Sequence, residues 1–522
     1  MQHKSILTLA FLNGAGIMAF EMISSKMLAP FYGTSLEVWA VTLAIVMGGL
    51  AIGYWLGGRR SAKYSGVASL CQLLFVAAIA VAIAPLLGNI LFASAYQTFG
   101  TSGSMVSSLF IVLPYMVLAG MVSPILTHII AADTHEAGAA AGKVFSLSTI
   151  GGVLATFATG YWLIPTLGLE SAVIVLASTY FIIGLVLIMG QSFKANRHAW
   201  LASTLSFILI GTSIAWTSST PFPGVLYRQT GLYGELMVAD IPLHYDGRVY
   251  PRRMLLNNRV GQTNMNIDSG CSLWPYAHYL LTLAGAKPEG SNALLLGLAG
   301  GSVANEFVKL GFNVDAVDLD PRVFTLATEF FKLSPKVHFI EDDARHYLNI
   351  QDKKYDLIVI DLFTGEGVPN HIITRESLAL LKKRLPPDGI VLINFHGYID
   401  GKDGKGARSV YKTLIDAGYT TRYLVTPGKP GARNAIFAAT PSQNPQFFAQ
   451  QAYRQVFCAL DWPAPNPPPL MAMDQARYED AYILQDEYPV LDRLNKAAYA
   501  DWRRYTIDHH LIELNEQGMP FF

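Results

Sequence analysis

Three aspartates in the second half of the chain could act on one ligand. Asp318 closes the apolar run "VDAVDL", Asp343 follows "VHFIE", and Asp361 ends "YDLIVID". If these runs are parallel strands, their carboxylates meet at the edge of the sheet where ligands bind. Asp318 would then suit a ribose diol, and Asp343 could accept a hydrogen bond from an adenine amino group. Asp361 could take a proton or hold a cationic amine.

A glycine-rich turn precedes these aspartates. "ALLLGL" has the composition of a buried strand, "SVANEFVKLG" that of a helix, and Gly297, Gly300 and Gly301 lie between them. Glycines at such a turn let a ligand approach the backbone, and an acid closing the next strand is typical of nucleotide binding. The pattern is not a strict GxGxxG. Taken alone, Asp343 could be a solvated loop carboxylate and Asp361 a cap of the following turn.

Residues 286–445 predict the domain that positions this site. Short apolar runs alternate there with amphipathic segments, which indicates a Rossmann-like α/β domain on a parallel sheet. Seven runs are expected to be strands: "ALLLGL", "VDAVDL", "VHFIE", "YDLIVID", "GIVLINF", "YTTRYLV" and "NAIFAAT". Residues 217–285 predict a small β subdomain, with hairpins in "GELMVADIPLHYDGRVYPRRMLLNN", and a connecting helix. "DWPAPNPPP" interrupts the fold, and residues 446–522 are expected to form a C-terminal helical tail.

Residues 1–216 predict a helical membrane domain. The chain of 522 residues is 52% hydrophobic and 15% charged, against about 25% charged in average soluble proteins. A bilayer core needs about 20 apolar residues per helix. Seven stretches meet this requirement: 6–23, 38–58, 67–94, 105–131, 144–166, 171–190 and 200–216. The lipid bilayer is therefore an expected partner, whereas a net charge of zero gives no electrostatic reason to expect nucleic acid.

Positive charges predict the orientation of these helices. Lys4 and the clusters "GGRRSAK" and "KANRH" should be cytoplasmic, because the intervening loops carry almost no positive charge. Seven crossings of the cell membrane would then place the soluble half outside the cytoplasm. If 200–216, the weakest stretch, does not cross, the soluble half returns to the cytoplasm. Cys271 and Cys458 could pair only if the soluble half faces an oxidising space.

The turn Gly297–Gly301 and the three aspartates, in this order and spacing, resemble the spermidine synthase family of polyamine aminopropyltransferases. The resemblance extends over roughly 225–440, and the whole chain is similar to fused MFS/spermidine synthase proteins in segments such as "KMLAPFYGTSLEVWA" and "DEYPVLDRL". It implies that Asp318 binds ribose, that Asp343 reads adenine, and that Asp361 activates or positions the attacking amine. Gln262 and Tyr276 also match positions of the family's site.

The chain departs from that family at the polyamine half of the site. Gly300 stands where the family has an aspartate that holds the donor's amine, and Thr364 replaces the second carboxylate of the catalytic loop. The family's Tyr-His-Glu segment is Tyr-Ala-His here, from Tyr276 to His278, so its glutamate is lost. His278 and Glu366 are the residues that could compensate. Loss of carboxylates weakens the electrostatic case for a polycation.

Three functions are compatible with this pattern. A membrane-anchored transferase would use S-adenosylmethionine or decarboxylated S-adenosylmethionine as donor, pass an alkyl group to an amine, and release methylthioadenosine. A lyase would let the donor's own carboxylate attack, which gives methylthioadenosine and homoserine lactone. A sensor or transporter would bind a nucleoside without turnover.

The expected ligands are small molecules rather than metal ions. The adjacent His509 and His510 lack the further convergent ligands that a metal site needs, so no metal is expected. The resemblance also implies a homo-oligomer, because spermidine synthases usually assemble through the soluble domain.

Overall fold

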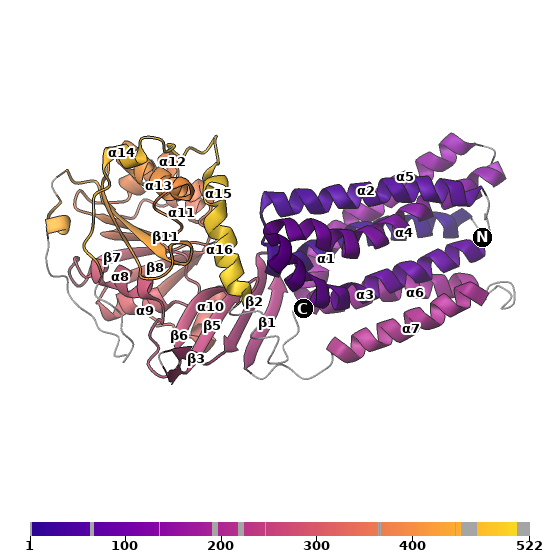
Figure 1. Ribbon diagram of the computed structural model, residues 1–522, viewed down its shortest axis with the longest axis horizontal. Helices are drawn as coiled ribbons and strands as arrows, with labels where there is room; N and C mark the ends of the chain where they lie inside the picture. The colour runs from indigo at the N-terminus through magenta and orange to yellow at the C-terminus, as the bar shows by residue number, and fades with distance from the viewer. Residues whose placement is uncertain are drawn as a thin grey trace. The chain divides into compact units, whose positions relative to one another are not determined.

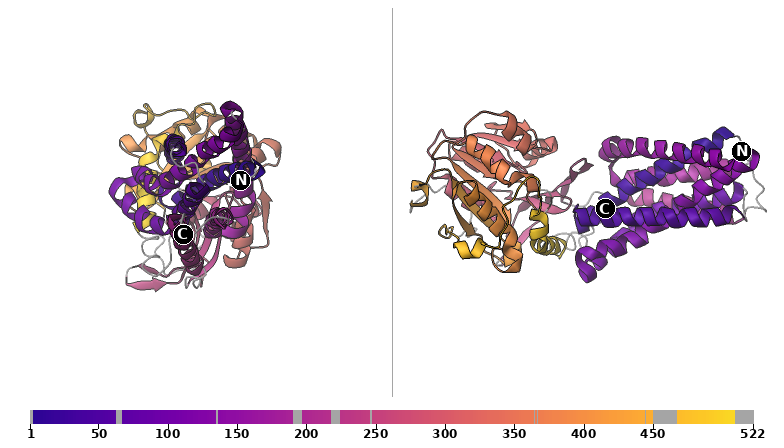
Figure 2. Two further views of the ribbon diagram at one scale, coloured as in Figure 1. Left: turned by 90° about the vertical axis from the view of Figure 1, so that its right-hand side faces the viewer. Right: turned by 90° about the horizontal axis from the view of Figure 1, so that it is seen from above.

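The computed structural model describes residues 3–62, 67–134, 136–189, 197–217, 224–245, 247–363, 365, 367–443, 445–449 and 467–508. The chain divides into two compact units (Figures 1 and 2). Unit 1 comprises Met1–Pro223, Gln229–Glu235 and Ile507–Phe522, and unit 2 comprises Gly224–Arg228 and Leu236–Thr506. Each unit is described in turn.

Unit 1 is dominated by long apolar helices that run side by side. They are α1 (His3–Tyr32), α2 (Leu36–Ser61), α3 (Val67–Phe99), α4 (Gly103–Thr134), α5 (Ala137–Ala158), α6 (Ile164–Ile188) and α7 (Arg197–Thr217). Each of the seven apolar stretches predicted from the sequence falls on helix, and 144–166 crosses from α5 through a π-helical turn, Thr159–Leu163, into α6. Within the described residues, five helical stretches are long and apolar enough to cross a membrane, because α3 with α4 and α5 with α6 each count as one.

Glycines set the closest approaches between these helices. A Cβ on Gly53 of α2 would lie 2.4 Å from the carbonyl oxygen of Val117 in α4, and a Cβ on Gly151 of α5 would lie 2.1 Å from that of Phe11 in α1. No larger side chain fits at such distances. Small residues commonly allow helices of membrane proteins to pack this closely.

Unit 2 contains a seven-stranded sheet and all of a small antiparallel sheet apart from Gln229–Glu235, which are assigned to unit 1. The small sheet has the order β1-β2-β5-β6, formed by β1 (Val225–Gly231), β2 (Gly234–Asp240), β5 (Arg252–Asn257) and β6 (Val260–Asn266). Strands β3 (Leu243–Tyr245) and β4 (Arg248–Tyr250) pair as a separate hairpin. The β5–β6 turn has positive φ at Asn258 and Arg259, as the tightest hairpin turns require. This turn directs β6, which carries Gln262 and Thr263, back along β5.

The larger sheet has seven strands in the order β12-β13-β11-β10-β7-β8-β9. They are β7 (Asn292–Leu296), β8 (Asn313–Asp318), β9 (Val337–Glu341), β10 (Leu357–Ile360), β11 (Ile390–His396), β12 (Thr420–Val425) and β13 (Asn434–Thr440). All seven predicted strands are confirmed. The chain order reverses beside β7, because β8 lies on one side of it and β10 on the other. Ligands of such sheets bind at this switch point.

The predicted parallel sheet is wrong at one edge. Strand β13 runs antiparallel to both β11 and β12, whereas β7 to β11 are parallel. The connection from β12 to β13 spans only 426–433. A parallel pair needs a crossover of about a dozen residues or more, so this short connection forces a hairpin.

Helices cover both faces of the larger sheet. Residues of α8 (Pro275–Ala284), α9 (Ser302–Lys309) and α10 (Pro321–Phe330) share one buried apolar cluster. Residues of α11 (Ala344–Ile350), α12 (Arg375–Lys383) and α13 (Lys405–Asp416) share the other. In β7, Leu295 faces the first cluster, whereas Leu294 and Leu296 face the second. Burial on both faces explains the continuous apolar runs of these strands.

The described part of the C-terminal segment contributes apolar residues to the core of unit 2. It contains α14 (Gln475–Tyr478), α15 (Leu491–Leu494) and α16 (Lys496–Thr506). Met471 pairs with Tyr423 of β12, and Leu484 and Leu491 are buried in the cluster on the α11–α13 face. The polar composition of the segment did not indicate this packing, because only a few well-spaced apolar residues anchor the segment. His509 and His510 lie outside the described residues.

Candidate functional site

The glycine-rich turn lies against the strand that carries Asp361. Gly297 has φ 99°, and a Cβ there would stand 2.3 Å from the carbonyl oxygen of Asp361. The backbone N–H of Asp361 donates to the carbonyl of Leu296 at 2.9 Å. Gly301, with φ 74°, is the N-cap of α9. Both glycines are therefore needed for backbone shape and close approach.

Asp318 is bound to the same turn. The backbone N–H of Leu298 donates to its Oδ2 at 2.9 Å, and that of Asp320 donates to its Oδ1 at 3.1 Å. Burial raises the pKa of Asp318, although these backbone hydrogen bonds act in the opposite direction. An ionised carboxylate has about four acceptor positions, so Asp318 retains acceptor capacity toward a ligand diol.

Asp361 is the carboxylate at the centre of the site. Asn394 of β11 donates through Nδ2 to its Oδ1 at 2.7 Å, and the Tyr276 hydroxyl donates to its Oδ2 at 3.4 Å. Burial raises the pKa of Asp361 to about 6, although both hydrogen bonds lower it. Burial and the nearby carboxylate hold the pKa of Tyr276 well above its usual value. A carboxyl group of this kind is suited to general-base work near neutral pH.

Two amide side chains fix the orientation of that carboxylate. Asn434 of β13 donates through Nδ2 to Oδ1 of Asn394 at 2.9 Å, so the amide of Asn394 presents its nitrogen to Asp361. No sequence motif indicated either asparagine as part of the site. Their strands were predicted, but only the pairing of β11 with β13 brings them together.

A narrow pocket opens between β6, α8 and the glycine-rich turn. Its lining residues include Gln262, Thr263, Trp274, Tyr276, Gly297 and Asp361. The cavity is about 20 Å³, which is room for roughly one water molecule. Asp361 is the one carboxylate among the described residues that line it. The Gln262 side chain reaches the loop after Asp361, where its Nε2 donates to the carbonyl of Gly365 at 3.4 Å.

Thr263 of β6 lies directly against Gly300 of the glycine-rich turn. The backbone N–H of Gly300 donates to the Thr263 hydroxyl at 2.8 Å, and a Cβ on Gly300 would lie 2.8 Å from that same oxygen. The space beside position 300 is therefore filled from β6. No signal in the sequence linked Thr263 to Gly300, because they are 37 positions apart.

Asp343 lies apart from this pocket, at the start of α11. Its Oδ1 accepts from the backbone N–H of His346 at 2.9 Å, and its Oδ2 is 3.6 Å from Nε2 of His371. The carboxylate is 42% exposed. The side chain thus caps α11, and it also faces solvent and the imidazole of His371.

Of the remaining predicted residues, the structure describes His278 but not Glu366. The ring of His278 is bonded through Nε2 to the backbone carbonyl of Ser272 at 2.7 Å, and His278 is not among the lining residues of the pocket. Glu366 and Thr364 lie outside the described residues. In the part of the chain that the structure describes, no group of three or more His, Cys, Asp or Glu residues is arranged to hold a metal ion.

Comparison with known families decides what this site belongs to. Residues 276–395 match the spermine/spermidine synthase domain family. The C-terminal part of this chain is a spermine/spermidine synthase domain. The matched segment of that domain begins at Tyr276 and ends after Asn394, so it contains the glycine-rich turn and all three aspartates.

Known proteins that are similar to this chain match different lengths of it. A polyamine aminopropyltransferase of Vibrio vulnificus is 28% identical over 277 residues, which are 51% of this chain and 89% of that protein. An N-terminal histidine N-methyltransferase of Emericella nidulans is 36% identical over 181 residues, 34% of this chain and 29% of that protein. A probable spermidine synthase structure from Corynebacterium glutamicum has a TM-score of 0.37 and 20% identity, and covers 44% of this chain and 85% of its own.

Proposed function

We propose that this protein is a membrane-anchored transferase of the polyamine aminopropyltransferase type. The observation that carries the proposal is the setting of Asp361, whose carboxylate is oriented by Asn394 and Tyr276 at the switch point of the sheet. Asp318, which accepts a hydrogen bond from Leu298 of the glycine-rich turn, would hold the ribose of a sulfonium donor. The related aminopropyltransferase of Vibrio vulnificus supports this reaction class.

In the proposed reaction, the protein contributes orientation and one base. The nitrogen lone pair of the amine forms a bond to the donor carbon next to sulfur. The bond from that carbon to sulfur breaks and its electron pair stays on sulfur, which leaves neutral methylthioadenosine. The proton of the attacking nitrogen passes to Asp361. With a pKa of about 6, Asp361 is mostly ionised at pH 7.5 and can receive it.

A second candidate is a lyase that acts on S-adenosylmethionine itself. Thr263 fills the space beside Gly300, and the pocket next to Asp361 is tight and holds a single carboxylate among its described lining residues. Both features disfavour a long polycationic acceptor. In the lyase, the donor's own carboxylate would bond to the same carbon, the carbon–sulfur bond would break, and methylthioadenosine and homoserine lactone would leave.

One incubation distinguishes these candidates. Detergent-purified protein is given decarboxylated S-adenosylmethionine or S-adenosylmethionine, each with and without putrescine, and methylthioadenosine is followed by mass spectrometry. Product only from the decarboxylated donor plus amine supports the transferase. Product from S-adenosylmethionine alone supports the lyase. Methylthioadenosine binding without product from either donor would overturn both and favour a nucleoside sensor.

We also propose that the helices of unit 1 cross the cell membrane and that the synthase domain lies outside the cytoplasm. Arg59 and Arg60 end α2, and the short connections after α1 and α3 carry no Lys or Arg. Cys271 is disulfide-bonded, and disulfides persist in oxidising compartments. Cys458, its expected partner, lies outside the described residues.

A reporter fused after Phe522 tests this orientation. Phosphatase activity of the fusion is expected if the C-terminus is outside the cytoplasm. Fluorescence of a reporter that matures only in the cytoplasm would place the domain inside and contradict the charge rule.

A further inference from the structure

The helix α16 lies outside the matched residues 276–395, yet it packs on the loop that follows Asp361. A Cβ on Gly367 would stand 2.3 Å from the hydroxyl oxygen of Tyr499 in α16. A Cβ on Gly365 would stand 3.8 Å from Nη2 of Arg503, one helical turn further on. The side chains of α16 therefore form one wall of the space that this loop occupies.

Arg503 differs sharply from its neighbour in the sequence. It is only 3% exposed, although it is a cation, whereas Arg504 faces solvent. Burial of a guanidinium group costs free energy unless the site around it compensates. Arg503 is thus held in place by its surroundings, and those surroundings include Gly365.

The opposite side of the loop is held from the pocket. Gln262 of β6 donates to the carbonyl of Gly365 at 3.4 Å. Gly365, with φ 74°, is therefore contacted both by this amide and by the Arg503 guanidinium. Within the described residues of the loop after Asp361, Gly365 thus has neighbours from the small sheet and from the C-terminal helix.

A second group of contacts joins the same helical segment to the strand that orients Asp361. Asn495, just before α16, donates through Nδ2 to the backbone carbonyl of His396 at 2.6 Å. The rings of Trp502 and His396 have their centroids 5.0 Å apart. His396 follows Asn394 by two residues on β11, and Asn394 donates to Asp361. Residues two apart in a strand share a face.

We propose that α16 is an integral wall of the active site, and that Arg503 and Tyr499 are positioning residues for the loop after Asp361. This inference rests on the proposed function. The ligand contacts expected for the donor nucleoside lie elsewhere, on the glycine-rich turn and at Asp318. Disturbance of α16 should therefore slow the reaction while nucleoside affinity is preserved.

The test compares Arg503→Met with Arg504→Met in the full-length protein, since both remove a charge from adjacent positions of one helix. Tyr499→Phe, which removes only a hydroxyl, serves as a milder variant. Three quantities are measured: deuterium exchange of peptides that contain Gly365 and Gly367, the Kd of methylthioadenosine, and kcat with whichever donor is turned over. Exchange does not require turnover, so it reports on the loop even if the proposed function fails.

Arg503→Met should accelerate exchange of the loop and lower kcat about tenfold or more, since small misplacements of a reacting group are costly. It should change the Kd of methylthioadenosine by less than about twofold, because the substitution leaves the contacts that bind the nucleoside unchanged. Arg504→Met should resemble the wild type in all three measurements. Unchanged loop exchange in both Arg503→Met and Tyr499→Phe would overturn the inference. An equal fall in kcat and in nucleoside affinity would mean that α16 has only a structural role. That result would also overturn the inference.

Discussion

The hydroxyl of Thr263 accepts a hydrogen bond from the backbone N–H of Gly300 at 2.8 Å and occupies the space in which a side chain at position 300 would begin. The glycine-rich turn and β6 are thereby in direct contact at the point where the related enzymes are expected to place an acid. An acidic side chain at position 300 would therefore require a change in shape as well as in charge.

Restoring the acid alone should therefore fail. Gly300→Asp is expected to lower thermal stability and methylthioadenosine affinity, because overpacking of a filled site costs about 1–3 kcal/mol. It should not increase putrescine-dependent product formation. The double variant Gly300→Asp with Thr263→Ala should recover part of the affinity, as measured by calorimetry. Faster turnover of putrescine by the single variant than by the wild type would show that the space is available after all.

Asp361→Asn should abolish the proton transfer while the site keeps its shape. Product formation is expected to fall about 10²- to 10⁴-fold, the usual share of a general base. In the wild type, kcat/KM should fall as the pH drops below about 6, because Asp361 is then protonated.

The same substitution should leave the folded protein at least as stable at neutral pH. The folded pKa of Asp361 is above its usual 3.8, so ionisation of this group opposes folding once the pH rises through about 6. An amide at position 361 cannot ionise. A melting temperature of Asp361→Asn well below that of the wild type at pH 8 would contradict this.

Asn394→Ala should change the pH dependence of the reaction. The hydrogen bond from Asn394 lowers the pKa of Asp361 against the effect of burial, so its removal should move the acidic limb of the kcat/KM profile to higher pH. Asn434→Ala, which acts on Asp361 only through Asn394, should produce a smaller shift in the same direction. A lower kcat with an unmoved acidic limb would mean that Asn394 has a packing role only.

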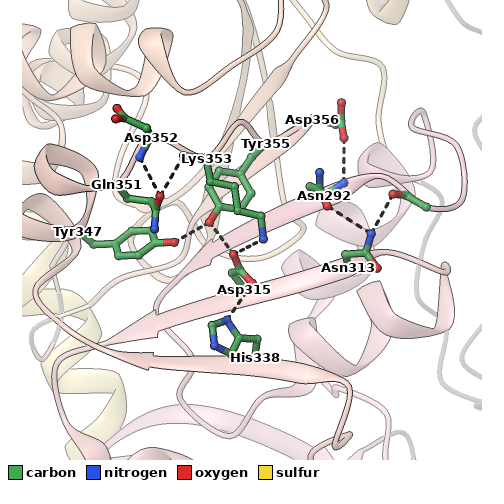
Figure 3. Close-up of polar contacts among 11 residues, drawn as sticks. Asn292, Asn313, Asp315, His338, Tyr347, Gln351, Asp352, Lys353, Tyr355 and Asp356 are labelled. Carbon is green, nitrogen blue, oxygen red and sulfur yellow. Dashed lines mark hydrogen bonds and ion pairs between the residues drawn. The ribbon is translucent and has the colours of Figure 1, made fainter.

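Asp315, which is itself buried, is the centre of a polar cluster on the opposite half of β8 from Asp318 (Figure 3). Its Oδ2 accepts from Nζ of Lys353 and from the hydroxyl of Tyr355, each at 2.6 Å, and its Oδ1 lies 3.2 Å from Nδ1 of His338. Burial alone would raise the pKa of Asp315, but the hydrogen bonds from Lys353 and Tyr355 and the charge of Lys353 outweigh it and lower the pKa. The carboxylate therefore links β8, β9 and the segment that precedes β10.

Asp315→Asn should destabilise the protein by about 1.5–3 kcal/mol, the usual contribution of a hydrogen bond to a charged group. Because the folded pKa is lowered, the stability contributed by Asp315 is present above its usual pKa and is lost as the pH falls through the folded value. The difference between variant and wild type in melting temperature should accordingly shrink toward pH 3.

The matched control is Asp352→Asn. Asp352 is 97% exposed and pairs with Arg384 at 2.6 Å, and exposed pairs of this kind contribute about 0–1 kcal/mol. Equal melting temperatures for Asp315→Asn and Asp352→Asn at pH 8 would show that the cluster does not contribute to stability.

Local sequence pattern was sufficient to predict the helices and strands and to identify the carboxylates at the ends of two strands. Apolar runs of β7 to β13 are long and continuous because both faces of the sheet are covered, so their strands could be found without any knowledge of their neighbours. Asp318 and Asp361 end two of these strands, and their position in the sequence already places them at the ligand edge. The seven helices of unit 1 follow equally directly from stretches of apolar residues.

Contacts between distant segments were beyond the sequence. The pairing of β13 with β11, which brings Asn434 to Asn394, joins strands that are far apart in the sequence, and no strand pattern encodes it. The filling of the space at Gly300 by Thr263 depends on how β6 meets the turn. The family resemblance grouped His278 with the site as a residue that could compensate for a lost glutamate, and only the structure shows that its ring is hydrogen-bonded to the backbone carbonyl of Ser272.

By itself, then, the sequence of this protein determined its helices, its strands and the carboxylates at their ends, because these depend on periodicity and on residues adjacent in the chain. Only the tertiary structure decided which amides orient Asp361, what fills the space at Gly300, and that α16 packs on the catalytic loop. Such relationships depend on side chains separated by tens to more than a hundred positions. Their proximity is set by packing of the whole unit, and packing leaves no local signature in the chain.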